Sequence, residues 1–268
     1  MESTKFQDIF GHSNVVIACI HVGALPGTPG YRNNWNEVID KAAREAELLA
    51  SVGFHGLIIE NMHDTPYLKR EVGPEITASM TILGDAVKRV VSIPVGVQVL
   101  AGANKAALAC AKAAGLDFIR GEGFVYGHLA DEGLFESDAG ELLRYRKMID
   151  AESIAIFTDI KKKHSAHAIT QDVPIGDWAK AAEFFRADGV IVTGSHTGEP
   201  AEINDIKNTR ENSQLPIIIG SGVNINNLST YLDLADGIII GSWYKKDGYW
   251  ANEIDNDRAR KIGDLIRR

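Results

Sequence analysis

Eight short apolar runs, each followed by a helical segment, constrain the fold of this chain more than any other feature. The runs are nearly continuous in apolar residues, which is typical of parallel strands buried on both faces. Alternation of strands with helices predicts an α/β protein, and eight such units favour closure of the sheet into a barrel. The runs are residues 15–20, 56–59, 95–97, 118–119, 154–158, 190–193, 217–219 and 238–240.

The length of the chain agrees with a single barrel. A (β/α)8 barrel typically takes about 250 residues, and this chain has 268. We therefore expect residues 1–14 to form an N-terminal lead-in and residues 15–268 to form one (β/α)8 TIM-barrel domain. An open, doubly wound sheet is the alternative.

Composition narrows the class of partner. The net charge of -8 disfavours a nucleic-acid partner, because phosphate-backbone binding needs clustered Lys and Arg. The first 14 residues lack the basic and apolar regions of a signal peptide, and Glu2 and Asp8 make a poor transit peptide. No apolar run approaches the ~20 residues of a membrane span. Cys19 and Cys110 are expected to be buried free thiols, so we expect a soluble, cytoplasmic protein without membrane insertion.

A closed barrel brings the C-terminal ends of all its strands to one mouth, where such folds carry their chemistry. The last two strands end in glycine and serine, which suits phosphate binding by loop backbone N–H groups and a helix N-terminus. Tight turns without a ligand are the alternative interpretation. The candidate phosphate-binding residues are Ser221, Gly222, Gly241 and Ser242, with Ser195 after the sixth strand.

Strands one, two and five end in His21, Glu60 and Asp159. These residues could be a catalytic acid, base and electrophile, because histidine and carboxylates transfer protons when burial and partners tune their pKa. They could equally hold a divalent metal, although the sequence requires no cofactor. For Glu60 the alternative is a structural ion pair with Arg120. Asp64, on the loop after strand two, is a further catalytic candidate.

Other polar residues fall at the same end of the barrel and are candidates for binding substrate: Asn61, Gln98, Arg120 and Lys161. Residues 121–140 form a long loop with five glycines. A loop of this length is usually functional, so it could be a lid that excludes water or a contact in a homo-oligomer. Nucleotide-loop and nucleophile-elbow motifs are absent, which disfavours kinase-like and α/β-hydrolase functions.

Taken together, these motifs resemble the BtpA family, which includes the SgcQ-like proteins. One departure is His63, where a small residue is common before Asp64. The resemblance covers nearly the whole chain and rests on the segments 20–29, 60–67, 120–124, 131–133, 143–146, 159–164, 193–194 and 220–223.

The resemblance implies a TIM-type barrel with a phosphate-binding end, and it brings a reported role in photosystem I accumulation. Two hypotheses follow. The first is an enzyme that acts on a small phosphorylated sugar or nucleotide-like metabolite by acid/base chemistry, as an isomerase, epimerase, lyase or glycosidic-cleavage enzyme. The second is a non-catalytic biogenesis or stability factor for a membrane complex.

Overall fold

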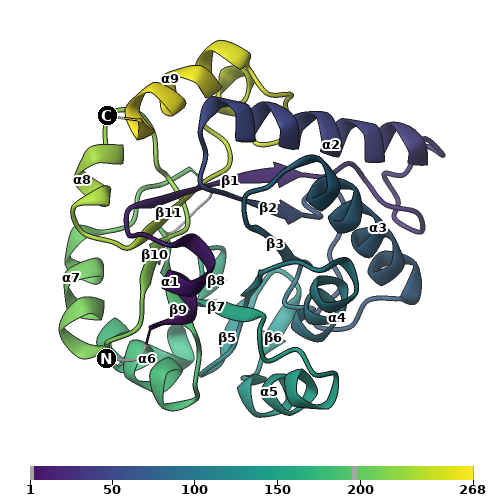
Figure 1. The fold of residues 1–268 in the computed structure, drawn as a ribbon. Helices are drawn as coiled ribbons and strands as arrows, with labels where there is room; N and C mark the ends of the chain where they lie inside the picture. Colours follow the sequence, from purple (N-terminus) through teal and green to yellow (C-terminus); the bar gives the residue numbers. More distant parts are fainter. Residues whose placement is uncertain (1–2, 195–197, 268) are drawn as a thin grey trace.

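The computed structural model describes residues 3–194 and 198–267, and its centre is a closed barrel of eight parallel strands (Figure 1). Each barrel strand pairs with the strands before and after it along the barrel, and the last pairs with the first. The predicted eight-unit barrel is confirmed. Its strands are β1 (Val15–His21), β2 (Gly56–Glu60), β3 (Val95–Gln98), β4 (Phe118–Gly121), β7 (Ala155–Ile160), β9 (Gly189–Val192), β10 (Ile217–Ile219) and β11 (Gly237–Ile240).

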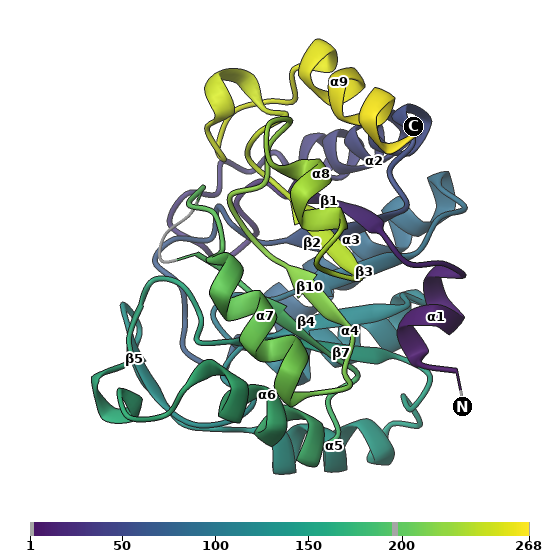
Figure 2. The ribbon, with the colours of Figure 1, turned by 90° about the vertical axis from the view of Figure 1, so that its left-hand side faces the viewer.

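Helices cover the outside of the barrel (Figures 1 and 2). The first of them has an apolar stripe at helical spacing, and its residues Val38, Ala42, Ala46 and Leu49 are buried. The covering helices are α2 (Trp35–Val52), α3 (Pro74–Val90), α4 (Asn104–Ala114), α5 (Ala139–Met148), α6 (Ile175–Phe184), α7 (Ile203–Asn212), α8 (Leu228–Leu232) and α9 (Asn256–Ile266). No helix within the described ranges is long and apolar enough to cross a membrane.

Neither α2 nor α6 begins with a side-chain cap. Asn34 precedes α2, but its side chain caps no backbone N–H group, and its amide donates instead to Glu37 Oε2 at 3.0 Å. Asp177 does not cap α6 either, because the helix begins at Ile175, after Pro174, and Asp177 lies in its first turn. There the carboxylate still favours the positive end of the helix dipole.

The N-terminal lead-in folds into a short helix, α1 (Lys5–Phe10), which lies at one end of the barrel (Figure 2). Phe6 and Phe10 are buried there, with ring centroids 5.8 Å from Phe157 and from Phe118 respectively. A Cβ on Gly56 would lie 2.9 Å from the Phe10 ring, so the absence of a side chain at Gly56 leaves space for α1. Each buried phenylalanine contributes about 2–3 kcal/mol, and α1 covers this end of the barrel, opposite the mouth formed by the C-terminal ends of the strands.

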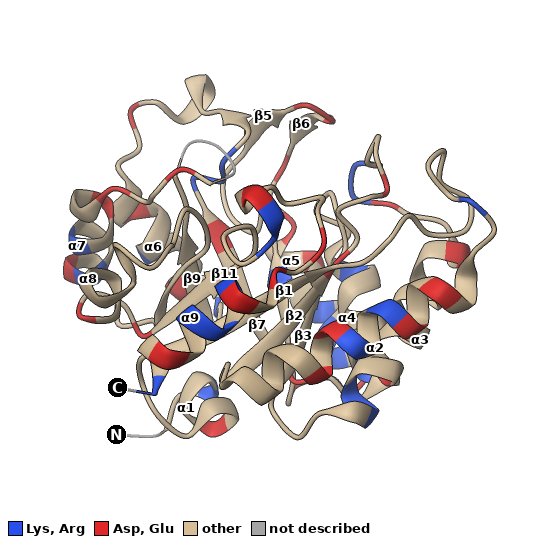
Figure 3. Ribbon diagram, turned by 90° about the horizontal axis from the view of Figure 1, so that it is seen from above, with Lys and Arg blue, Asp and Glu red and all other residues tan. Residues whose placement is uncertain are grey.

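The long loop after β4 contains unpredicted secondary structure. Its strands β5 (His128–Ala130) and β6 (Gly133–Phe135) form a hairpin, and β8 (Ser165–Ala166), from the loop after β7, pairs with β5 to complete a small antiparallel sheet. A turn of 3-10 helix, η1 (Ala168–Thr170), follows β8. This sheet lies at the end of the barrel away from α1 (Figure 2), and Figure 3 shows acidic residues at the tip of the β5–β6 hairpin. Arg70 anchors its base, donating to Asp138 Oδ2 at 2.7 Å and to the carbonyl of Gly123 at 2.7 Å.

Candidate functional site

A buried ion cluster occupies the barrel mouth, with Arg120 at its centre. Arg120 comes from β4 and donates through Nε and Nη2 to both carboxylate oxygens of Asp159 on β7, at 3.1–3.3 Å. Its Nη1 donates to Glu60 Oε1 on β2, at 3.3 Å. All three residues are at most 5% exposed. Both oxygens of Asp159 and one oxygen of Glu60 therefore accept hydrogen bonds from Arg120. Glu60 Oε2 is the one carboxylate oxygen of these two residues without an arginine partner.

Glu60 is ionised in this setting. Burial opposes its charge, but Arg120, followed by His21 and Lys163, outweighs burial and lowers the pKa of Glu60. The ion pair that we considered as the structural alternative for Glu60 is thus present. It fixes one oxygen and leaves the other facing His21, so the ion pair also orients the carboxylate.

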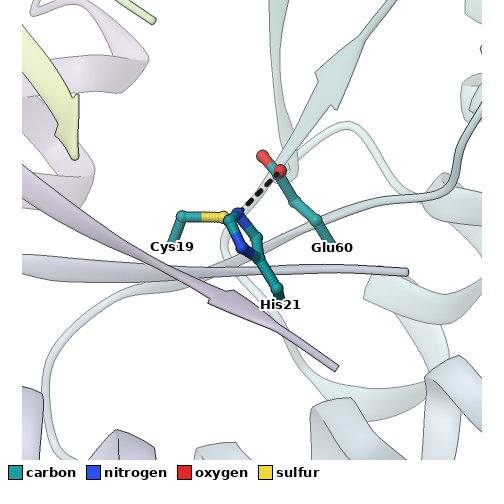
Figure 4. A group of neighbouring side chains, drawn as sticks. All are labelled: Cys19, His21 and Glu60. Atoms are coloured by element: carbon teal, nitrogen blue, oxygen red, sulfur yellow. Dashed lines mark ion pairs between the residues drawn. The ribbon is translucent and has the colours of Figure 1, made fainter. Parts of the chain in front are cut away.

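His21 lies at the end of β1, in register with Glu60 on β2. Its Nδ1 lies 2.9 Å from the carbonyl oxygen of Trp250, and a carbonyl can only accept, so Nδ1 carries the proton. Its Nε2 is 3.9 Å from Glu60 Oε2 (Figure 4). Burial, and then the charge of Lys245, lowers the pKa of His21 to about 4. His21 is therefore neutral near pH 7, with the Nε2 lone pair toward Glu60.

Cys19 joins this pair at the floor of the mouth. Its sulfur, His21 Nε2 and a Glu60 oxygen lie within 4.8 Å of one another (Figure 4). The sequence interpretation treated Cys19 only as a buried small residue, and it is indeed buried. The signal that could have found it is the spacing Cys19-x-His21, because alternate residues of a strand point to the same side. Cys110, by contrast, lies in α4, and its thiol donates to Thr77 O at 3.2 Å.

Three consecutive lysines after β7 point in three directions. Lys162 is buried, with its Nζ 3.1 Å from Glu122 Oε2 and over the Phe135 ring. Lys161 lines a surface pocket with Asp205, which Lys162 and Lys163 also line, but it does not line the cavity of the glycine loops. Lys163 lines the barrel mouth, and burial, followed by the charge of Arg120, lowers its pKa. No carboxylate of the described residues lies within 4 Å of Lys163 Nζ, which sets it apart from Lys162.

The direction of each lysine follows from the backbone of this loop. Lys161 and His164 both have positive φ values, 45° and 54°. Side chains other than glycine and asparagine rarely adopt this region, and such strain is common at functional sites. The sequence interpretation chose Lys161 as the lysine for phosphate, whereas the cavity that contains the glycine loops is lined by Lys163.

The glycine and serine loops after β10 and β11 line a cavity of about 130 Å³. No hydrogen bond to a described residue uses the backbone N–H of Gly222, Val223, Gly241 or Ser242. A Cβ on Gly222, where φ is 70°, would lie 2.2 Å from the Glu199 carbonyl, so the loop needs glycine here. The same cavity is lined by His21, Glu60 and Lys163. A Cβ on Gly241 would lie only 3.2 Å from His21 Nε2, so the loop and the polar cluster touch.

Two parts of the phosphate hypothesis change on the structure. The Ser221 hydroxyl is used internally, because it accepts from Gly194 N at 2.9 Å and donates to Glu199 O at 3.2 Å. No helix begins directly after β11, where a turn and a short 3-10 segment, η2 (Lys246–Gly248), follow instead. The helix N-terminus that we expected is therefore missing, and loop N–H groups are what remains for an anion. Ser195 lies outside the described residues.

Asn61 and Asp64 are scaffolding at the rim of the mouth. Asp64 accepts from Leu25 N and from Asn61 Nδ2, both at 2.9 Å, and Asn61 Oδ1 accepts from Leu100 N at 2.7 Å. The two side chains therefore connect the loops that follow β1, β2 and β3, and both are at most 5% exposed. Their predicted contact with substrate is not visible in this geometry, because their polar atoms are occupied by protein partners.

A second cavity, of about 250 Å³, extends the mouth toward the β5–β6 hairpin. Gln98 lies on its wall and donates to Glu122 Oε1 at 2.9 Å, so Glu122, which the sequence placed only in the long loop, is a residue of the mouth. Asp131 and Glu132, at the hairpin tip, line the same space. The two cavities share Met62 and the three charged residues Glu60, Arg120 and Lys163. The mouth thus has an N–H-rich compartment and a carboxylate-rich one.

This combination of a closed eight-stranded parallel barrel and a charged mouth at its C-terminal end defines the chain as a TIM-barrel protein. The chain belongs to the BtpA family, whose family model matches residues 12–268. An uncharacterized mitochondrial protein of Caenorhabditis elegans is 47% identical over 253 residues, which is 92% of this chain and 91% of the relative. The photosystem I biogenesis protein BtpA of Synechocystis is 34% identical over 95% of this chain and 88% of its own length.

Solved structures with similar folds include tryptophan synthase and phosphoribosyl anthranilate isomerase. Tryptophan synthase from M. tuberculosis, in its aminoacrylate-bound form, has a TM-score of 0.61 at 12% identity, covering 99% of this chain and 100% of the other. Phosphoribosyl anthranilate isomerase from Thermus thermophilus has a TM-score of 0.57 at 14% identity, covering 94% of this chain and 98% of its own. At these identities the likeness establishes the fold.

Proposed function

We propose that this protein is an enzyme that acts on a small phosphorylated metabolite by acid/base chemistry at the barrel mouth. One observation carries the proposal: a loop pair whose backbone N–H groups donate to no described residue shares a cavity with Lys163, Glu60 and His21. Converging N–H groups form an anion site, and the cavity gives that anion a fixed distance from groups that can bind or move a proton.

The phosphate would bind at Gly222, Gly241 and Ser242, with the Lys163 ammonium able to offset part of its charge. Phosphate sites after strands seven and eight recur in TIM-barrel enzymes. The name of one structural neighbour, phosphoribosyl anthranilate isomerase, includes a phosphoribosyl group, which supports a phosphorylated substrate here too. The body of the metabolite would extend past Glu60 into the second cavity, toward Gln98 and Glu122.

Lys163 is the best placed group to transfer a proton. Burial lowers its pKa, and a lysine with a lowered pKa exchanges its proton more readily near neutrality. Glu60 Oε2 would accept a hydrogen bond from a substrate hydroxyl, while Asp159 keeps Arg120, and through it Glu60, in position. The β5–β6 hairpin would act as the lid, since Asp131 and Glu132 at its tip face the same space. A single proton-transfer group beside a phosphate anchor favours isomerase, epimerase or lyase chemistry.

Ligand binding to the full chain tests the anion site. We expect ribose 5-phosphate to raise the melting temperature and ribose at the same concentration to leave it unchanged, because binding to the folded state alone stabilises it. Ser242→Glu places a negative charge on the cavity wall and should weaken ribose 5-phosphate binding at least about tenfold, the equivalent of 1.4 kcal/mol. Ser229→Glu, on the exposed face of α8, is the matched control and should bind as the wild type. Equal stabilisation of wild type and Ser242→Glu would contradict the site.

A second candidate function is a non-catalytic biogenesis factor, and it is favoured by the name of the Synechocystis relative, a photosystem I biogenesis protein. This function needs the folded barrel and its outer surface, but no proton-transfer group in the mouth. In cells that lack the protein, Lys163→Met expressed at normal levels would then restore the phenotype fully. Failure of Lys163→Met to restore it, with a folded protein present, would favour the enzyme.

A further inference from the structure

Three side chains that can bind a metal converge at the floor of the mouth. Cys19 and His21 are two residues apart on β1 and therefore point to the same side, into the barrel. Glu60 is opposite His21 in the register of β1 and β2. Figure 4 shows the three side chains together, and their ligand atoms all lie within 4.8 Å of one another. Adjacent strands of the barrel thus supply a thiol, an imidazole and a carboxylate to one point.

The partners of these residues leave the right atoms pointing inward. His21 donates its Nδ1 proton to the Trp250 carbonyl at 2.9 Å, which turns the Nε2 lone pair toward Glu60. Arg120 holds Glu60 Oε1 at 3.3 Å and leaves Oε2 toward His21. An imidazole that donates its other N–H to a carbonyl, beside a hydrogen-bonded carboxylate, is the usual outer shell of metal ligands. The two facing acceptors are 3.9 Å apart, too far for a hydrogen bond.

We infer that Cys19, His21 and Glu60 bind a divalent transition metal of the Zn²⁺ type, with a fourth position open to the cavity. Thiolate with imidazole suits such metals, whereas Mg²⁺ and Ca²⁺ prefer oxygen ligands. Tetrahedral Zn²⁺ places its nitrogen, oxygen and sulfur ligands about 3.4–3.6 Å apart, so the three atoms need to draw together by about 1 Å. Asp159, which we grouped with His21 and Glu60 from the sequence, is held by both of its oxygens on Arg120.

Three protein ligands and an open position are typical of catalytic zinc, whereas structural zinc is closed by four. A metal bound here would supply a Lewis acid beside the loop that contains Gly241. This loop is close to the site, because a Cβ placed on Gly241 would lie 3.2 Å from His21 Nε2. The inference does not rest on the proposed enzyme function, since metal binding is measured without any substrate.

Cobalt titration of the full chain, freed of metal with a chelator, tests the site. We expect Co²⁺ to bind one per chain, to produce a thiolate-to-cobalt absorption band in the near ultraviolet, and to be displaced by Zn²⁺. Binding should release a proton, because the Cys19 thiol must ionise. Cys19→Ser should abolish the band, and His21→Gln should weaken binding at least about tenfold. The chain has two cysteines, so Cys110→Ser is the matched control and should keep the band.

Melting curves of the metal-free variants establish whether each is folded. If Cys19→Ser does not fold, the loss of Co²⁺ binding in His21→Gln or Glu60→Gln tests the site instead. Stoichiometric Co²⁺ binding with a band that survives Cys110→Ser and disappears in Cys19→Ser would support the site. A folded wild type that shows no band, or a band that follows Cys110, would overturn it.

Discussion

The two ends of the barrel interior are built from the same strands and have opposite character. At the end plugged by α1 the interior is apolar, with the phenylalanines of α1, β4 and β7 in contact. At the mouth the interior is charged and equally buried. On three of the strands the change takes two residues, from Ile58 to Glu60, Phe118 to Arg120 and Phe157 to Asp159.

This contrast separates stability from chemistry within one barrel. The apolar end stabilises the fold by burial, about 25 cal/mol per Å² of apolar surface. The charged end contributes little net stability, since the cost of desolvating ions can equal their attraction. It keeps Glu60, His21 and Lys163 in one cavity, which is what binding and catalysis require. Three variants test how complete this separation is.

The largest effect should come from removing the centre of the ion cluster. Arg120→Met leaves Glu60 and Asp159 buried without their counter-charge, and we expect it to lower the free energy of unfolding by about 3–5 kcal/mol at pH 7. Urea unfolding measures the loss. The triple variant Arg120→Met, Glu60→Gln, Asp159→Asn should recover most of it, because no uncompensated charge remains. A loss below about 1 kcal/mol would mean that water reaches the cluster.

An intermediate effect should appear in the pH dependence of stability. The pKa of His21 falls from 6.5 to about 4 on folding, so the unfolded chain binds more protons between these values. Above pH 6.5 His21 is neutral in both states and does not change the free energy of unfolding. As the pH falls from 6.5 to 4, the protonation of His21 in the unfolded chain lowers the free energy of unfolding progressively, by up to about 3 kcal/mol. We expect His21→Gln, unfolded in the presence of a chelator, to lose less stability than wild type between pH 6.5 and 4. Exposed His12→Gln is the control, and an unchanged slope in His21→Gln would contradict the assignment.

The smallest effect is expected at the plugged end. Phe10→Leu keeps an apolar side chain against Phe118 and should cost about 1–1.5 kcal/mol of unfolding free energy. Calorimetry measures the change in melting temperature. The same variant should leave Co²⁺ and ribose 5-phosphate binding as in wild type. Altered ligand binding in Phe10→Leu would show that the two ends are coupled and would break the separation.

Much of the fold and part of the site could be read from the chain. The eight strands and the alternation with helices are local patterns of apolar residues, and the structure confirms them. Cys19 was interpreted only as a buried thiol and Glu122 only as part of the long loop, because their positions in the mouth depend on neighbours from other strands. Lys161 was chosen from three consecutive lysines, and no local pattern distinguishes it from Lys163, which lines the cavity. The small sheet over the mouth was also missed, since its strands have two or three residues each and carry little periodicity.

The sequence by itself determined that this protein is a barrel with a polar, glycine-rich mouth, because strand burial and strand ends are written in consecutive residues. Only the tertiary structure decided which polar groups pair with protein partners and which face the cavity. The sequence made Arg120 a candidate for binding substrate or phosphate, and in the structure its guanidinium donates to the carboxylates of Glu60 and Asp159 from two other strands. Asp64 could have been catalytic, but the Leu25 N–H and the Asn61 amide take its oxygens. Which charged side chains pair depends on the distance between them in space. Closure of the barrel sets that distance, and separation along the chain does not.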